Sequence, residues 1–226
     1  MRAQTFEIRV CESCELRYPQ VTGQAHGKRC PVCAGNTRVV YKGDLIRERS
    51  HSFSLDSSRP TDAFPKPKGF GEDRGGGFSV LLDNVRSAWN VGSMLRTAEG
   101  FRFMHAYLCG ITPTPENNAV QKTSLGAEDS VPWSYHKDAV RLAKGLKFEG
   151  WKIFALEEDA NAAPLKPIQK TNVDSVLIVG NEISGVDPEL LSLCDRVFYI
   201  PMRGEKKSFN AAVAFGIAAY TLHASD

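Results

Sequence analysis

The sequence predicts an α/β protein, with a mostly parallel sheet covered by helices on both faces and a small metal-binding ribbon in front of it. From position 78 onward, short apolar runs alternate with segments of helical period, a pattern that favours a parallel sheet. Two Cys-x-x-Cys pairs stand within the first 41 residues. We therefore expect a ribbon at 1–41, a linker at 42–77 and an α/β domain at 78–226.

The two cysteine pairs are Cys11 with Cys14 and Cys30 with Cys33. Their spacing is typical of a zinc ribbon, in which two tight turns aim four thiolates at one tetrahedral Zn²⁺ and close the site. A rubredoxin-like iron site, two disulfides, or His26 in place of one cysteine are the alternatives. Because few apolar residues lie between the pairs, we expect the metal to supply the folding energy of this segment.

The linker at 42–77 is rich in Ser, Pro and Gly and has no sustained period. Such a composition predicts a flexible tether between two domains. Four of its basic residues are either nucleic-acid contacts or solvated charges: Arg49, Arg59, Lys66 and Lys68.

The α/β region divides into five strands and four helices. We expect strands at 79–82, 106–109, 153–156, 175–179 and 197–200, and helices at 91–99, 139–149, 188–193 and 209–223. The last helix is apolar on nearly every side, which predicts that both of its faces are buried, one of them at a subunit interface. Cys109 and Cys194 are expected to be small buried side chains.

Composition and charge limit the classes of protein. The chain has 226 residues, 42% of them hydrophobic, which suffices for one full core and a small satellite domain. No apolar run approaches the roughly 18 residues of a membrane span, and no secretory h-region is present, so we expect a cytoplasmic protein. Residues 1–78 carry 13 Lys and Arg against 9 Asp and Glu, whereas residues 79–226 carry 15 against 17. This basic excess fits either a nucleic-acid contact or a solvated surface.

Three polar, Gly-containing blocks occur in the second half of the chain. They read NVGSMLR at 90–96, GNEISG at 180–185 and IPMRGEKKSFN at 200–210, and each comes after an expected strand. Ligands bind at the carboxyl ends of the strands in open α/β sheets, so the blocks predict one composite site. The chain lacks the GxGxxG and Walker lysine motifs, which disfavours a dehydrogenase or an NTPase.

Order and content of the blocks resemble the three motifs of the SpoU (TrmH-like) branch of the SPOUT RNA methyltransferases. These enzymes transfer a methyl group from S-adenosylmethionine to a ribose 2′-hydroxyl. The resemblance covers about residues 79–226. It implies a C-terminal trefoil knot and a homodimer with the active site at the subunit boundary. The third block departs from the usual Ser-Leu-Asn of the family, because it reads Ser208-Phe209-Asn210.

The resemblance also assigns site residues. It implies catalytic roles for Asn90, Arg96, Glu182, Ser208 and Asn210. It implies that the cofactor is bound by Leu156, Gly180, Asn181, Ile200, Met202 and Phe209. Because a guanidinium keeps its proton up to a pKa above about 12, Arg96 suits a phosphate clamp or a stabiliser of developing negative charge better than a base. The general base is unassigned.

Further expectations concern the first block. Asn90 is placed to cap a helix that begins at Val91, and Gly92 is placed to let the substrate approach its first turn. Arg96 is expected on the same face of this helix, with Glu182 orienting either Asn90 or Arg96.

The sequence therefore predicts S-adenosylmethionine-dependent methylation of a ribose 2′-hydroxyl in tRNA or rRNA. The zinc ribbon would recognise RNA with Lys28 and Arg29 beside the metal, and Lys206 and Lys207 are either phosphate contacts or merely exposed. Two alternatives remain open at this stage. One is a catalytically silent RNA-binding protein that uses the knotted domain as a scaffold, and the other is a methyltransferase that acts on a base.

Overall fold

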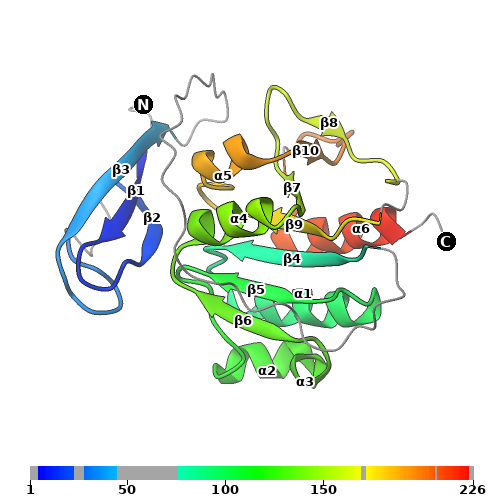
Figure 1. Ribbon diagram of the computed structural model, residues 1–226, viewed down its shortest axis with the longest axis horizontal. Helices are drawn as coiled ribbons and strands as arrows, with labels where there is room; N and C mark the ends of the chain where they lie inside the picture. The colour runs from blue at the N-terminus through cyan, green and yellow to red at the C-terminus, as the bar shows by residue number, and fades with distance from the viewer. Residues whose placement is uncertain (1–4, 23–27, 45–75, 169–171, 207, 224–226) are drawn as a thin grey trace.

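The computed structural model describes residues 5–22, 28–44, 76–168, 172–206 and 208–223, which form two sheets (Figure 1). Most of the expected linker, including Arg49, Arg59, Lys66 and Lys68, lies outside the described residues, as do His26 and Lys207.

The N-terminal segment forms a three-stranded antiparallel sheet, here called the ribbon. Its strands are β1 (Thr5–Cys11), β2 (Arg17–Val21) and β3 (Thr37–Asp44), in the order β2-β1-β3. Its buried apolar side chains are few: Phe6, Ile8, Leu16 and Tyr18, together with Cys11 and Cys30. A segment of about 40 residues usually needs a metal or disulfides in addition to apolar burial of this extent.

The main sheet has seven strands in the order β6-β5-β4-β9-β7-β10-β8, and every neighbouring pair is parallel. The strands are β4 (Phe78–Asp83), β5 (Ala106–Cys109), β6 (Trp133–His136), β7 (Lys152–Leu156), β8 (Ala163–Pro164), β9 (Ser175–Val179) and β10 (Arg196–Tyr199). The five strands expected from the sequence are confirmed. The sequence missed β6, which is short and partly polar, and β8, which has two residues.

Helices cover both faces of this sheet, as expected. They are α1 (Ala88–Gly100), α2 (Asn118–Ser124), α3 (Ala127–Ser130), α4 (Ala139–Phe148), α5 (Pro188–Leu193) and α6 (Ala211–His223). One apolar cluster packs α1 and α6 against one face, and a second packs α4 and α5 against the other. Strand β9 lies between them with all five residues buried, which explains its uninterrupted apolar sequence.

Helix α1 begins earlier than expected and corrects two predictions. Its N-cap is Ser87, whose Oγ accepts a hydrogen bond from the Asn90 N–H (3.3 Å), so Asn90 lies in the first turn and does not cap the helix. Gly92 is buried against α2: a Cβ there would come within 2.0 Å of Thr123 Oγ1 and 2.3 Å of the Val120 carbonyl oxygen. Gly92 therefore permits close helix packing and does not admit a substrate.

Helix α6 buries one face within the chain. Phe215, Ala218, Ala219 and Leu222 are in the core, whereas Val213 is 51% exposed and Tyr220 is 66% exposed. The sequence predicted burial on both faces, so the second face would have to be covered by another molecule. Among the described residues, no helix is long and apolar enough to cross a membrane.

The ribbon packs against the carboxyl edge of the main sheet, the edge to which the arrow of β4 points in Figure 1. The Arg17 N–H donates to the carbonyl of Lys137, directly after β6, over 3.0 Å. Ile111, just after β5, packs on the ribbon core. The ribbon thus contacts the α/β domain through side chains and backbone, in addition to its covalent connection.

Candidate functional site

A cavity of about 690 Å³ opens at the carboxyl ends of β9, β7 and β10, beside the start of α6. A volume of this size accommodates a ligand as large as a nucleoside derivative. Nine of the eleven residues that the sequence assigned to catalysis or cofactor binding line this cavity: Leu156, Gly180, Asn181, Glu182, Ile200, Met202, Ser208, Phe209 and Asn210. Asn90 and Arg96 are not among its lining residues.

The loop at 180–185, here called the second-block loop, forms one wall of the cavity. Asn181 and Gly185 exchange two backbone hydrogen bonds, of 3.1 and 2.9 Å, which fold the loop back on itself. A Cβ on Gly180 would lie 2.3 Å from the Val186 nitrogen, so only glycine fits at this closed turn.

The Asn181 side chain shapes this loop, whereas the resemblance assigned the residue to cofactor binding. Its Oδ1 accepts hydrogen bonds from the N–H groups of Ile183 (2.9 Å) and Ser184 (3.1 Å). Its Nδ2 donates to the Asn84 carbonyl (2.7 Å), and the residue is buried. With its polar atoms engaged inside the protein, Asn181 faces the cavity chiefly through its backbone.

A chain of side chains joins all three blocks. The Asn90 Nδ2 donates to Glu182 Oε1 (3.0 Å), and the Asn210 Nδ2 donates to Asn90 Oδ1 (3.1 Å). Glu182 also accepts from the N–H groups of Arg86 (2.9 Å) and Ser87 (3.1 Å). A carboxylate is favoured there because these N–H groups belong to the positive end of α1. Glu182 thus orients Asn90, one of the two partners expected from the sequence.

Asn210 has a second task at the start of α6. Its Oδ1 accepts hydrogen bonds from the N–H groups of Ala212 (2.9 Å) and Val213 (3.3 Å), the geometry of a helix cap. Ser208 and Phe209 precede it as exposed residues that line the cavity.

Arg96 lies on α1 as an exposed residue, away from the chain of Asn90, Glu182 and Asn210. Because each residue turns an α-helix by about 100°, six residues rotate Arg96 about 240° from Asn90. The expectation that the two share one face is therefore wrong. In this single chain Arg96 is exposed and does not line the cavity.

Glu157 is a site residue that the sequence reasoning missed. It lines the cavity, and its Oε2 accepts a hydrogen bond from the Val186 N–H at the end of the second-block loop (2.8 Å). Its position directly after β7, at the edge where ligands bind, was the available signal.

A cluster of buried charges lies behind the second-block loop. Asp83 ends β4 and accepts hydrogen bonds from the Asn84 Nδ2 (2.8 Å) and the Asp187 N–H (2.9 Å). Burial, together with the nearby Asp187 carboxylate, raises the pKa of Asp83 to about 7. Arg17 of the ribbon reaches into this cluster, where its Nε donates to Asp187 Oδ2 over 2.8 Å.

The four ribbon cysteines form a second candidate site. Their sulfur atoms lie within 4.8 Å of one another, with 3.5 Å between Cys11 and Cys33 and 3.7 Å between Cys14 and Cys30. Four sulfurs about 2.3 Å from a tetrahedral metal are about 3.8 Å apart, whereas disulfide sulfurs are about 2.05 Å apart. The arrangement fits one metal ion and does not fit two disulfides.

The local environment favours thiolate at Cys11, whereas burial and the neighbouring thiols raise the pKa of Cys14 to about 12. Burial would raise the pKa of Cys11, but the backbone N–H groups of Cys14 and Ser13 and the neighbouring thiols lower it to about 6. Both N–H groups lie 3.4 Å from the Cys11 sulfur. Such donors stabilise the negative charge that a metal ligand carries.

Comparison with known families identifies the domain that carries the cavity. A model described as the SpoU rRNA Methylase family matches residues 77–220. The chain belongs to this SpoU family. The match includes all three blocks and begins beyond the ribbon, which is therefore an addition to the family domain.

Curated relatives of this SpoU chain carry names of RNA methyltransferases. It is 32% identical over 143 residues to the 23S rRNA (guanosine(2553)-2′-O)-methyltransferase RlmP of Bacillus subtilis, covering 63% of this chain and 56% of that protein. It is 30% identical over 142 residues to the tRNA (guanosine(18)-2′-O)-methyltransferase of Thermus thermophilus, covering 63% and 72%. The chain spans about half the length of the first of these relatives.

Solved structures of RNA-modifying enzymes share the fold. An AdoMet-bound rRNA methyltransferase from Sinorhizobium meliloti superposes with a TM-score of 0.63 at 25% identity, over 67% of this chain and 57% of that one. The TrmH/SpoU tRNA modifying enzyme of A. aeolicus superposes with a TM-score of 0.59 at 26% identity, over 68% and 77%.

Proposed function

We propose that this SpoU-family chain is an S-adenosylmethionine-dependent RNA methyltransferase that acts on a ribose 2′-hydroxyl of tRNA or rRNA. The observation that carries the proposal is the cavity at the carboxyl edge of the sheet, where residues of the second and third blocks meet and the first block is joined to them by hydrogen bonds. Relatives named as 2′-O-methyltransferases of both rRNA and tRNA support the reaction class.

The cavity suits S-adenosylmethionine in size and lining. Apolar side chains of Leu156, Ile200 and Met202 offer a surface for a purine, and the tight turn at Gly180 keeps the backbone of the second-block loop in the cavity wall. Glu157 and Glu158 add carboxylates that suit the positive charge of a sulfonium or an ammonium group. When bound, this compound supplies a methyl group on a sulfonium.

The chain's own residues would position the acceptor and stabilise the charge that develops on its oxygen. Asn90 and Asn210 carry amide groups held by hydrogen bonds with each other and with Glu182, so their orientation is set before any substrate binds. Ser208 adds a hydroxyl at the same mouth. Arg96 is the proposed clamp for an RNA phosphate, and the group that accepts the hydroxyl proton remains unassigned.

We propose a homodimer as the functional assembly. The uncovered face of α6 presents Val213 and Tyr220, and Trp89 of α1 is 62% exposed. A second copy on this surface would bury these apolar groups. It would also explain why Arg96 lies outside the cavity of its own chain, since the family resemblance places the active site at the subunit boundary. The trefoil knot is an expectation of the same resemblance, and the cytoplasmic location is an expectation from the sequence.

We propose zinc as the metal of the ribbon and RNA as its partner. Four cysteine sulfurs at tetrahedral spacing leave no open coordination position, which is typical of structural Zn²⁺. Lys28 and Arg29 are exposed beside this site, and Lys206 lies at the cavity. Elemental analysis of the folded protein should find about one zinc per chain. A result of one iron per chain would identify a rubredoxin-like centre instead of a zinc site, and a result without metal would refute the metal site.

The decisive experiment is nucleoside mass spectrometry after incubation of the purified protein with S-adenosylmethionine and separate pools of unmodified tRNA and rRNA. We expect one 2′-O-methylated nucleoside in one pool. Arg96→Ala should abolish this product without weakening cofactor binding, and Arg102→Ala, an exposed arginine just beyond α1, is the matched control. A methylated base would correct the acceptor, and no product together with no cofactor binding would favour a non-catalytic RNA-binding protein.

A further inference from the structure

The contact between the ribbon and the α/β domain centres on Arg17, the first residue of β2. Its Nε and Nη2 donate to the two carboxylate oxygens of Asp187 over 2.8 and 3.1 Å. The same Nη2 lies 3.0 Å from Glu189 Oε2. Arg17 and Asp187 are both buried, with relative exposures of 7% and 4%. This bidentate ion pair is buried and joins segments that are 170 residues apart, so it is a specific contact between the two domains.

Asp187 lies two residues beyond the second-block loop, at the N-cap of α5. Its Oδ1 accepts from the Glu189 N–H (2.9 Å) and thereby caps α5, and its own N–H donates to the buried Asp83 (2.9 Å). The residue before it, Val186, donates its N–H to Glu157 at the cavity wall. Arg17 therefore holds the residue at which the cavity-lining loop joins the scaffold.

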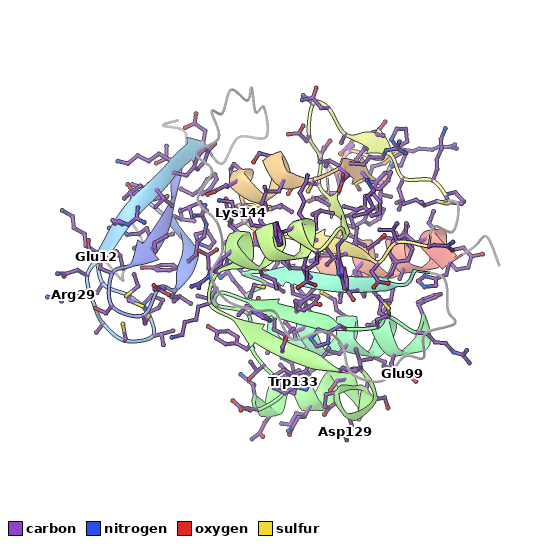
Figure 2. The ribbon with its side chains drawn as sticks, in the orientation of Figure 1. Glu12, Arg29, Glu99, Asp129, Trp133 and Lys144 are labelled. Atoms are coloured by element: carbon purple, nitrogen blue, oxygen red, sulfur yellow. The ribbon has the colours of Figure 1, made fainter. Side chains whose placement is uncertain are left out.

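The charges around Arg17 make its presence necessary. Four carboxylates act on it or on one another: Asp83, Asp138, Asp187 and Glu189. Lys144, labelled in Figure 2, neutralises part of this charge by contacting Glu189 Oε1 from α4 over 2.9 Å. Burial disfavours the charged guanidinium, yet the contact with Asp187 raises the pKa of Arg17. Without the guanidinium, Asp187 would be a buried carboxylate facing other carboxylates.

The position of Arg17 is in turn set by the cysteine site. The Cys11 N–H donates to the Leu16 carbonyl (2.9 Å), so the first cysteine pair and the residue before Arg17 belong to one tight turn. Leu16 is buried beside Cys11 and Cys30 in the ribbon core. A metal that orders the cysteines thus also orders the backbone that carries Arg17.

We propose that Arg17 is a positioning residue for the second-block loop, and that the ribbon is through it a structural part of the cofactor site. This inference rests on the proposed function for its cofactor readout. It predicts that disturbing one side chain of the ribbon changes the affinity of a cavity in the other domain.

The experiment uses the full chain with Arg17→Gln and Arg17→Lys. The matched control is Arg9→Gln, because Arg9 is also a buried ribbon arginine but makes its contacts with Glu7 and Thr37 inside the ribbon. Two quantities are measured: the Kd of S-adenosylmethionine by calorimetry, and hydrogen exchange of the peptide that spans 180–187.

Arg17→Gln should weaken cofactor binding about 3- to 30-fold, the usual range for coupling through a packed network, and should speed exchange in 180–187. Arg17→Lys should recover part of both effects because it keeps the charge, and it also decides the matter should the Gln variant fail to fold. Arg9→Gln should leave the Kd and the loop exchange unchanged.

Unchanged affinity and unchanged exchange in both Arg17 variants would overturn the inference. A wild-type chain that does not bind S-adenosylmethionine would instead refute the proposed function. In that case the exchange of 180–187 still decides the inference, since it reports on the loop without any cofactor.

Discussion

Glu182→Gln is the change that most directly tests the junction of the three blocks. The carboxylate accepts three hydrogen bonds: Oε1 takes those from Ser87 N–H and Asn90 Nδ2, and Oε2 takes the one from Arg86 N–H. Glutamine has nearly the same shape but only one acceptor oxygen. If the glutamine oxygen takes the Oε1 position, it keeps the hydrogen bonds from Ser87 N–H and Asn90 Nδ2. The amide NH₂ group then faces the Arg86 N–H, and because both groups are donors that hydrogen bond is lost.

The expected loss follows from these contacts. One hydrogen bond contributes about 0.5–1.5 kcal/mol, and removal of a negative charge from a helix N-terminus costs about 0.3–1 kcal/mol. Because Glu182 is exposed, the lower half of the summed range applies, about 1–1.5 kcal/mol. A loss of about 1.4 kcal/mol in the positioning of Asn90 corresponds to about a tenfold drop in turnover.

The assay compares single-turnover methylation and hydrogen exchange at the start of α1 in the wild type and the variant. Glu99→Gln is the matched control, because Glu99 is an exposed glutamate of α1 that does not line the cavity. Glu182→Gln should slow methylation about tenfold and speed exchange of the Arg86 and Ser87 amides, with Glu99→Gln unchanged. If Glu182→Gln shows full turnover and unchanged exchange, the carboxylate does not organise the junction and the reasoning fails.

Three further predictions concern the buried charges and the loop. The pKa of Asp83 is raised to about 7 in the folded chain, against about 3.9 in the unfolded chain. The contribution of Asp83 to stability is therefore full below about pH 4 and is lost as the pH rises through 7. In urea unfolding across this window, the free energy of unfolding of the wild type should fall relative to that of Asp83→Asn, and a constant difference would refute this prediction. Burial and nearby His136 lower the pKa of His105 to about 4. The contribution of His105 to stability is therefore full above about pH 6.5 and is lost as the pH falls through 4. His105→Gln should remove this loss of stability in acid, and an unaltered dependence of stability on acidic pH would contradict the lowered pKa. Gly180→Ala should weaken S-adenosylmethionine binding about 10- to 100-fold, because the new methyl group meets the Val186 nitrogen. Gly204 lines the same cavity, and a Cβ there has no atom within 4 Å, so the Gly204→Ala protein should bind S-adenosylmethionine normally.

Local patterns in the sequence predicted much of the fold. The run Ser175–Val179 predicted a strand covered on both faces because each of its residues suits burial. The three blocks predicted a composite site because each follows a strand, and parallel strands end at one edge. Family resemblance then named nine residues that line one cavity.

The sequence did not predict the helix cap of α1, helices α2 and α3 or the partner of Arg17, because no local pattern distinguishes them. Ser87 and Asn90 are both good helix caps, and only the structure shows that Ser87 takes this role. Helices α2 and α3 have seven and four residues, too short for a helical period to stand out. Arg17 gives no local sign that it pairs with Asp187, because an ion pair 170 residues apart leaves no periodicity in either segment.

That separation has a consequence for the order in which the chain assembles during synthesis. The ribbon closes through contacts between residues 5 and 44, so it can fold as soon as its segment has left the ribosome. Arg17 must then wait until residue 187 and strand β9, which completes the centre of the sheet, have been made. The docking of the ribbon therefore belongs to the last stage of folding, and a nascent chain arrested before β9 should carry an ordered but undocked ribbon.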